Sequence, residues 1–403
     1  MPRATKRRKP LIHLLGAGRW QCPTIGAARR LGYRVLVTDM YRRRPGYALA
    51  DEHVVCDLRD AEATLEIARR RRVRGILCDT TDAGVATAAY VAQRLGLPGI
   101  PHGVALNFTD KARMRRLSLK KGVLNPSFYE VGSLAELRSA AGKLGFPLVV
   151  KPRDNQASRG VSIVRAAVDL RTAFSRALEN TAKPTVLAEE WIAGTEVTVE
   201  GLALNGEYHT LAMSDKDHYK DAPQVASRLT YPPDFTARML RKIRRANEAT
   251  VAALGLTDGP THGEYIVADK GVYLVEIAAR GGGSRIFSHI APRLSGVDLI
   301  RTSIRLAMGE PVPRPRLKAR PGAANLEFFR FPAGRVRAIR GLARARALPG
   351  VDEIALEFKK GDVLAPITDD RSRHGYMVVY AGTRERALAV SARVKELVRV
   401  ELS

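Results

Sequence analysis

Hydrophobic residues in the first hundred positions form short apolar runs that alternate with longer amphipathic stretches. The short runs predict buried strands and the longer stretches predict helices. The predicted strands are 11–15, 34–38, 54–55 and 75–78, and the predicted helices are 23–31, 61–71 and 84–95. Strands that alternate with helices are typical of a doubly wound α/β domain with a parallel sheet. We expect this domain to span residues 11–115, after a basic tail at residues 1–10.

The first predicted strand runs into Gly16-Ala17-Gly18, and the second ends at Asp39. A glycine turn and a terminal acid are the start of a dinucleotide-binding pattern, but the full G-x-G-x-x-G/A motif needs a small residue at position 21. Gln21 stands there. A nucleotide-linked oxidoreductase is therefore kept as an alternative function, with the motif against it.

The middle of the chain presents a lysine beside a polar loop. Residues 146–152 predict a strand that delivers Lys151 at its end, and the loop 153–160, with Ser158 and Gly160, follows it. Backbone N–H groups of such a loop and a mobile cation suit phosphate. Upstream, Thr109 is the expected N-cap of a helix that includes Lys111.

Residues 262–283 predict a β-hairpin with Asp269-Lys270-Gly271 as its loop. With a three-residue loop, Ile266 lies opposite Leu274 and Glu264 lies opposite Glu276. Like charges opposed across two strands are destabilising, so a cation should lie between them. Oxygen ligands suit Mg²⁺ or Mn²⁺. We expect a helix at 297–308 to pack behind this hairpin.

The last 80 residues predict a small α+β unit that follows a proline- and arginine-rich linker at 311–321. The expected strands are 324–330, 336–339, 354–358 and 375–380, and a helix at 383–397 ends the chain. No group of catalytic residue types stands out here, so we expect a structural unit or a lid.

Composition adds a net charge of +26 among 403 residues. Its arginines are spread along the chain without a recognised nucleic-acid motif, so we expect nucleic-acid binding to be non-specific at most. A non-catalytic basic nucleic-acid-binding protein is kept as a further alternative. No apolar run approaches the ~20 residues that span a bilayer, and the three cysteines form no C-x-x-C pair. We expect a cytoplasmic protein that is not bound to a membrane.

Several motifs occur together in a fixed order. They are Thr109-Asp110-Lys111, Pro147 to Pro152, Gln156 to Val161, Glu189 to Glu196, and the hairpin with Arg280. In this order the chain resembles the ATP-grasp carboxylate–amine ligases, a superfamily that includes amino-acid ligases, biotin carboxylase and the ATP-binding halves of carbamoyl-phosphate synthetase. The resemblance implies a pre-ATP-grasp domain at 11–115, an ATP-grasp domain at 116–315 with a lid-bearing subdomain at 116–190, and a small C-terminal domain at 322–403.

The same resemblance implies roles for individual residues. Glu264 and Glu276 would hold Mg²⁺, and Arg280 would stabilise the acyl-phosphate. The implied ATP-binding residues are Lys111, Lys151, Ser158, Gly160, Glu189, Glu190, Trp191, Ile192 and Glu196. Many relatives have asparagine where this chain has Ala278, which puts a second metal ion in doubt.

The implied activity is ATP-dependent and ADP-forming. A carboxylate is activated as an acyl-phosphate and an amine then attacks it, with an amino acid or another small metabolite as substrate. Residues placed to face the substrate are Lys216, His218, Ser284 and Arg285. The implied partners are a small carboxylate and a small amine, and a homodimer is left open.

Overall fold

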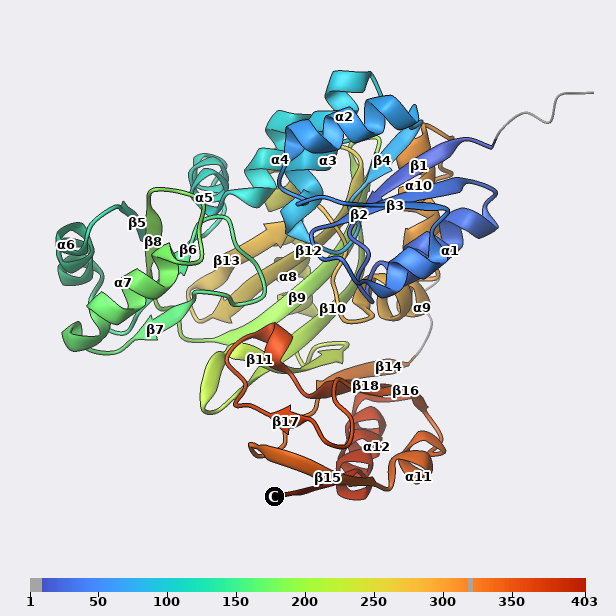
Figure 1. Cartoon of the computed structure of the whole chain (residues 1–403). Coiled ribbons are helices and arrows are strands. Elements are labelled where there is room, and N and C mark those ends of the chain that lie inside the picture. The colour runs from blue at the N-terminus through green and yellow to red at the C-terminus, as the bar shows by residue number, and fades with distance from the viewer. Residues whose placement is uncertain (1–8, 318–321) are drawn as a thin grey trace, which may run out of the picture.

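The computed structural model describes residues 9–317 and 322–403. The expected basic tail therefore lies almost wholly outside the described residues, as does the end of the expected linker. Figure 1 shows three parts around one long sheet: an N-terminal α/β layer, a projecting subdomain of green strands, and a C-terminal part in orange and red. The limits drawn between domains from the sequence stay predictions.

The N-terminal part is a parallel sheet with strand order β3-β2-β1-β4. Strands β1, β2 and β4 are mostly buried because helices cover both faces of the sheet, whereas the edge strand β3 is partly exposed. The strands are β1 (Leu11–Leu15), β2 (Arg34–Asp39), β3 (Glu52–Val55) and β4 (Gly75–Leu77). The helices are α1 (Cys22–Arg30), α2 (Ala61–Arg71), α3 (Val85–Leu95) and α4 (His102–Thr109). The predicted doubly wound opening is confirmed.

The projecting subdomain has an antiparallel sheet with order β5-β8-β6-β7, and its apolar cluster contains residues of this subdomain alone. The strands are β5 (Phe128–Val131), β6 (Leu148–Pro152), β7 (Ser162–Val164) and β8 (Val186–Glu190). The helices are α6 (Leu134–Leu144) and α7 (Leu170–Leu178). Helix α5 (Lys111–Lys120) precedes this subdomain and packs against α4 and α8 (Ala237–Leu254). The expectation that Thr109 caps α5 is wrong: Thr109 ends α4, and the Asp110 carboxylate accepts from the Ala112 and Arg113 amides.

The central sheet has eight strands in the order β13-β12-β9-β10-β11-β14-β18-β16. Its first five strands in the chain are β9 (Thr195–Leu204), β10 (Glu207–Tyr219), β11 (Ala222–Tyr231), β12 (Gly259–Ala268) and β13 (Gly271–Ala278). The other three come from the C-terminal part: β14 (Ala323–Phe328), β16 (Val351–Leu356) and β18 (Gly375–Ala381). The C-terminal segment is thus built into the central sheet through the β11–β14 ladder.

The remaining elements flank these sheets. The helices are α8 (Ala237–Leu254), α9 (Ala291–Ser295), α10 (Leu299–Met308), α11 (Leu342–Arg346) and α12 (Arg384–Leu397). A small C-terminal sheet contains β15 (Gly334–Arg340), β17 (Val363–Leu364) and β19 (Arg399–Leu402). Short helical turns are η1 (Pro45–Leu49), η2 (Asp82–Gly84), η3 (Ala167–Asp169), η4 (Ile286–Ile290) and η5 (Asp370–Ser372).

The helix behind the hairpin is mainly α8, not the stretch expected at 297–308. Ile243 and Val251 of α8 share a buried cluster with Tyr265 and Leu274 of the hairpin. Helix α10 instead covers the N-terminal sheet so closely that a Cβ on Gly75 would lie 2.4 Å from the Ala307 carbonyl oxygen. The apolar face of α10 is therefore buried against a sheet that lies more than 200 residues earlier in the chain.

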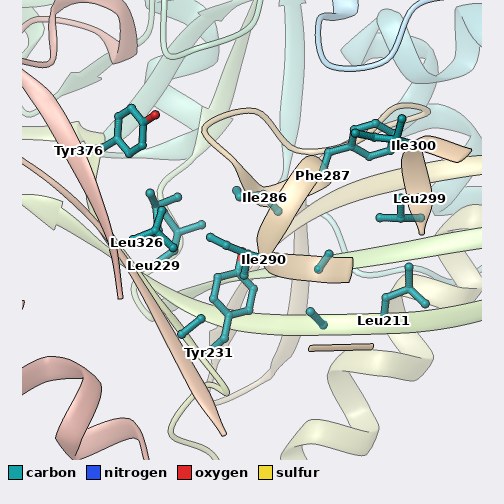
Figure 2. Packing of buried hydrophobic residues seen from close by; sticks show 14 of the residues in the cluster. Leu211, Leu229, Tyr231, Ile286, Phe287, Ile290, Leu299, Ile300, Leu326 and Tyr376 are labelled. Carbon is teal, nitrogen blue, oxygen red and sulfur yellow. The ribbon is translucent and has the colours of Figure 1, made fainter. Parts of the chain in front are cut away.

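One buried cluster joins the N-terminal, central and C-terminal parts. It contains Ile12 and Val37 of the first sheet, Leu229 and Tyr231 of β11, and Tyr376 of β18. Figure 2 shows Tyr231, Leu229 and Leu326 gathered beside Ile286 and Ile290, which lie in the turn that follows the hairpin. This packing fixes the exit of the hairpin against the central sheet.

Candidate active site

A large cavity of about 1020 Å³ lies where the three parts meet. Its lining comes from the first sheet, the projecting subdomain, the central sheet and the C-terminal strands. The sequence-predicted site residues that line it are Lys111, Lys151, Ser158, Glu189, Glu190, Trp191, Ile192, Glu196, Lys216, His218, Glu264, Glu276, Arg280 and Ser284. Gly160 and Arg285 are not among the residues that line it.

The hairpin places Glu264 directly opposite Glu276, as expected. The expected loop, however, is wrong. The turn contains only Asp269 and Lys270, so Ile266 pairs with Tyr273 rather than with Leu274. A register shift between Glu264 and Tyr265 then restores the pairing of the two glutamates. A β-bulge, which local sequence does not reveal, compensates for the shorter turn.

Each glutamate of this pair is neutralised by a lysine from another element. The Lys216 ammonium on β10 lies 3.0 Å from Glu264, and the Lys111 ammonium at the start of α5 lies 2.7 Å from Glu276. Burial opposes ionisation of Glu264, but the charge of Lys216 and a contact from His262 more than offset it and hold its pKa well below the ordinary range. The two lysines therefore supply positive charge that the opposed carboxylates require.

His262 belongs to the same group of charges. Its Nδ1 lies 2.6 Å from the buried Glu200, and its Nε2 lies 3.4 Å from Glu264. Burial disfavours the charged ring, but the two carboxylates outweigh it and raise the pKa of His262 to about 9. At neutral pH this side chain is an imidazolium.

Lys151 lies at the end of β6 and pairs with Glu189 on the neighbouring strand β8, at 2.7 Å. Arg115 of α5 holds both oxygens of the same carboxylate, at 3.0 and 3.2 Å. Burial works against the charge on Glu189, but the two cations lower its pKa to about 2. The Glu189 carboxylate is thus bound by cations of the protein itself. Lys151 both pairs with Glu189 and lines the cavity.

Glu196 at the start of β9 is held by two cavity residues that the sequence had placed toward the substrate. The Lys216 ammonium lies 2.6 Å from it, and His218 Nε2 lies 3.0 Å from its other oxygen. Lys216 therefore bridges Glu196 and Glu264. These residues form one ion-pair network along the cavity wall.

Arg280 and Arg285 both follow the hairpin, yet they point to different partners. Arg280 makes a two-point ion pair with Asp82 of the N-terminal part, at 2.8 and 2.9 Å. Arg285 adopts a left-handed backbone conformation, and its guanidinium pairs with Glu353 of β16 at 2.8 Å. Ser284, also left-handed, is the one of this pair that lines the cavity.

The loop after β6 crosses the cavity and contacts the parts on either side. The Gln156 amide bonds the Thr81 hydroxyl and the Asp82 amide, at 2.7 and 2.8 Å, and the Ser158 hydroxyl donates to the Gln224 carbonyl at 2.6 Å. Gly160 has φ +73, and a Cβ there would lie 2.7 Å from Asn180 and from Pro152. Gly160 therefore allows the loop to turn, and it does not line the cavity.

Several residues of this site were missed from the sequence. The C-terminal part contributes Arg371, Arg373 and Tyr376, where no functional group was expected. Asp82 follows β4, and polar residues after a parallel strand are a recognised signal for a site. Arg115, Glu200 and His262 offered no such signal, because their roles depend on partners far away in sequence.

Gln21, which departs from the dinucleotide-binding motif, packs against the glycine turn that follows the first strand. Gln21 lies against Gly16 and Gly18 and donates to the Thr80 hydroxyl at 2.6 Å. Asp39 is also occupied, because its carboxylate accepts from the Ala17 and Tyr41 amides and from Arg44. In a dinucleotide site these positions contact pyrophosphate and ribose, so the geometry disfavours the oxidoreductase alternative.

The two glutamates fit a Mg²⁺ site of the kind that is completed by a nucleotide. Within residues 9–317 and 322–403, no cluster of three or more histidine, cysteine or acidic side chains could enclose a metal ion alone. Mg²⁺ commonly takes one or two protein carboxylates and fills its other positions with phosphate oxygens and water. Glu264 and Glu276, with Lys111 and Lys151 in the same cavity, provide that arrangement.

Two family comparisons match the chain. The ATP-grasp domain matches residues 144–288, and the L-amino acid ligase C-terminal domain 2 matches residues 327–403. The chain therefore contains an ATP-grasp domain. It is an ADP-forming carbon–nitrogen ligase, which uses ATP and Mg²⁺ to activate a carboxylate for attack by an amine.

Curated relatives are distant but extensive. A formate-dependent phosphoribosylglycinamide formyltransferase of Rhodococcus jostii is 28% identical over 349 residues, which are 85% of this chain and 85% of that protein. An uncharacterized protein of Sinorhizobium fredii is 27% identical over 323 residues, 79% of this chain and 66% of its own length.

Solved structures share the fold over nearly the whole chain. The L-amino acid ligase from Bacillus licheniformis has a TM-score of 0.84 at 22% identity and covers 98% of this chain and 100% of its own. The phosphoribosylglycinamide synthetase from Anaerococcus prevotii has a TM-score of 0.77 at 19% identity, with the same coverage. None of the described helices has the length and apolar character needed to span a bilayer.

Proposed function

We propose that this ligase joins an amino acid, through its carboxylate, to the amine of a second small molecule, and so forms an amide or peptide bond. The observation that carries the proposal is the convergence of two opposed glutamates, two lysines and Arg280 on one cavity that the C-terminal strands help to close. The match of residues 327–403 to an L-amino acid ligase domain supports the substrate class, because Arg373 and Tyr376 of that segment line the cavity.

The proposed roles follow from charge and position. Lys111 and Lys151 bind the ATP phosphates, and Glu264 and Glu276 hold the Mg²⁺ ion, which neutralises phosphate charge when bound. Transfer of a phosphoryl group depends mostly on positioning and on charge neutralisation. Arg280 stabilises the acyl-phosphate, and residues 189–192 with Glu196 contact adenine and ribose. The loop 153–160 covers the phosphates and excludes water that would hydrolyse the intermediate.

Substrate binding requires that part of the ion-pair network opens. Lys216 and His218 are bound to Glu196 in this structure, so a ribose at Glu196 would release both cations toward the cavity. Released cations can bind the carboxylate of an amino acid. Ser284 borders the same space.

A phosphoribosyl amine is the second candidate substrate, because the named curated relatives act on phosphoribosylglycinamide. Gln21 lies over the two glycines of the first loop, and Asp39 is already bound by Arg44 and two backbone amides. These are the positions that would meet a phosphate and a ribose at the end of such a sheet. Because the protein's own side chains occupy this loop, an amino acid is favoured over a nucleotide-like substrate.

The experiment that tests the function is phosphate release from MgATP across a matrix of carboxylates and amines. The matrix crosses the common amino acids with one another and includes formate with phosphoribosylglycinamide. We expect phosphate release only when an amino acid and an amine are both present, with equal amounts of ADP and coupled product by mass spectrometry. Turnover confined to the phosphoribosyl arm would replace the first candidate with the second.

Two further expectations belong to this proposal. We propose that the enzyme acts in the cytoplasm, where ATP is available. We also propose a homodimer, since one solved neighbour is described as a dimer of biotin carboxylase domains. Sedimentation velocity at micromolar concentration distinguishes a dimer from the 44.1 kDa monomer.

A further inference from the structure

The segment at residues 79–82, which follows β4, holds the exit of the hairpin at two points. The Gly281 amide donates to the Asp79 carbonyl at 2.8 Å, and the Asp82 carboxylate takes the Arg280 Nε and Nη2 groups at 2.8 and 2.9 Å. Both side chains of this ion pair are mostly buried, with 14% of Asp82 and 11% of Arg280 exposed. A two-point contact of this kind fixes the plane of a guanidinium.

The remaining donors of Arg280 determine what it can still bind. A guanidinium has five N–H donors. Two are used by Asp82, and Nη1 donates to the Gly281 carbonyl at 2.9 Å. Two donors therefore remain, one on Nη1 and one on Nη2. The ion pair with Asp82 fixes their direction, and Arg280 lines the same cavity as Glu276.

The loop 153–160 contacts the same segment. Gln156 receives a hydrogen bond from the Asp82 amide and donates one to the Thr81 hydroxyl. The residue that orients Arg280 is thus also the residue that the closed loop touches. Asp82 lies in the N-terminal part, Arg280 follows the central hairpin and Gln156 belongs to the projecting subdomain, so the contact joins three parts of the molecule.

We propose that Asp82 is a positioning residue that holds Arg280 in the orientation required by the transferred phosphoryl group, and that Gln156 makes this orientation depend on closure of the loop. This inference rests on the proposed function, because it takes Arg280 as the residue that meets the acyl-phosphate. Asp82 itself does not touch the reacting atoms. Its effect should therefore appear in the transition state and not in the binding of ADP.

The test uses the full chain with MgADP, with and without aluminium fluoride as a stand-in for the phosphoryl group in transfer. Binding is followed by fluorescence of Trp20 and Trp191, the two tryptophans of the chain, which both line the cavity. In the wild type, aluminium fluoride should tighten MgADP binding. Asp82→Asn should keep the wild-type affinity for MgADP alone. The gain in affinity caused by aluminium fluoride should be roughly tenfold smaller than in the wild type, which is within the range of coupling energies between contacting residues.

Further variants separate positioning from a structural effect. Arg280→Ala should lose the tightening, and the double variant should lose no more than Arg280→Ala alone, because Asp82 acts only through Arg280. Asp82→Glu should restore part of it. The control is Asp352→Asn, which removes an ion pair with Arg293 outside the cavity and should change nothing in this assay.

The outcomes distinguish the two claims. A wild type without tightening would overturn the phosphoryl-transfer function, and this inference with it. Tightening that survives in Asp82→Asn, or losses that add in the double variant, would overturn the inference alone. Should Asp82→Asn fail to fold, as judged by its melting curve, Gln156→Ala takes its place and should reduce the tightening without changing MgADP binding.

Discussion

Single side chains in this cavity carry more than one task, and Lys151 illustrates it. From the sequence, its charge was assigned to the nucleotide phosphates alone. The structure adds a buried partner, Glu189, which also receives Arg115. Because removing one partner of a buried ion pair leaves the remaining charge less well compensated, substitution of Lys151 affects stability as well as binding.

Lys151→Met tests these two tasks together. Arg115 still neutralises Glu189, so the variant should fold, with a loss of about 1–3 kcal/mol in unfolding free energy for one charged hydrogen bond. MgATP binding should fall at least about tenfold, since one phosphate-binding cation is gone. Urea unfolding and tryptophan fluorescence measure the two effects. An unchanged MgATP affinity in a folded variant would remove Lys151 from the site.

His262 gives a prediction about pH. Its folded pKa of about 9 lies above the ordinary value of 6.5, so its charge stabilises the native state fully below pH 6.5 and this contribution is lost as the pH rises through about 9. Between pH 7 and pH 10 the wild type should lose on the order of 1–3 kcal/mol more than His262→Gln. Urea titrations at several pH values measure this difference. The exposed His53, replaced by glutamine, is the control, and equal pH slopes in wild type and His262→Gln would contradict the assignment.

Among elements, the hairpin shows what the sequence could predict and what it could not. The alternation of residues predicted both strands and the pairing of Glu264 with Glu276, which is confirmed. The turn was one residue shorter than expected, and a bulge restored the register. The lysines that neutralise the two glutamates come from α5 and β10, and no local pattern links those segments to the hairpin.

These lysines reverse the expected effect of Glu264→Gln on the protein without nucleotide. With repulsion alone, the variant would be as stable as the wild type or more so. Because Glu264 is held by Lys216 and His262, its loss should instead cost about 1–3 kcal/mol of unfolding free energy. Stabilisation by Mg²⁺-ATP should also largely disappear, since one of two metal-binding carboxylates is gone.

Paired melting curves with and without Mg²⁺-ATP measure both effects. Glu327→Gln is the matched control, because it breaks the ion pair of a buried glutamate with Lys395 away from the cavity. That variant should lose stability and keep the response to Mg²⁺-ATP. A Glu264→Gln protein that responds to Mg²⁺-ATP like the wild type would refute the metal site.

For the whole molecule, the net charge of +26 concerns solution behaviour more than the site. Cations around the cavity are largely matched by acids, as with Lys111, Lys151, Lys216 and Arg280. The excess positive charge therefore lies elsewhere on the chain. Nucleic-acid binding should be weak and independent of sequence.

Fluorescence anisotropy with two unrelated duplexes tests this expectation across a salt series. Both affinities should be equal and should fall steeply with rising salt, as counterion release requires. MgADP affinity, measured in parallel, should remain when the duplexes are saturating. A sequence-selective complex that survives physiological salt would instead favour a nucleic-acid-binding role.

The arrangement of buried clusters predicts how the molecule unfolds. From the sequence, the C-terminal segment looked like a separate small unit. Its strand β14 instead pairs with β11, and Leu326 and Tyr376 share a cluster with Ile12 of the first strand. The C-terminal segment has a second apolar cluster of its own, around Met377 and Val394. The projecting subdomain differs because it contributes no residue to the cluster shared with the first strand, and packs only in its own.

A shortened chain that ends at residue 317 lacks the C-terminal part and should therefore not fold stably. Removal of β14 would leave the β11 edge unpaired and expose Leu229 and Tyr231, which favours aggregation. Hydrogen exchange on the full chain gives the complementary measurement. Amides of β1, β11 and β18 should exchange at one common, slow rate, while those of β6 and β8 should exchange faster, because a separate cluster can open alone. If the shortened chain stayed monomeric and melted with the full cooperativity of the intact protein, the shared core would not hold these parts together, and the C-terminal segment would be the separable unit that the sequence suggested.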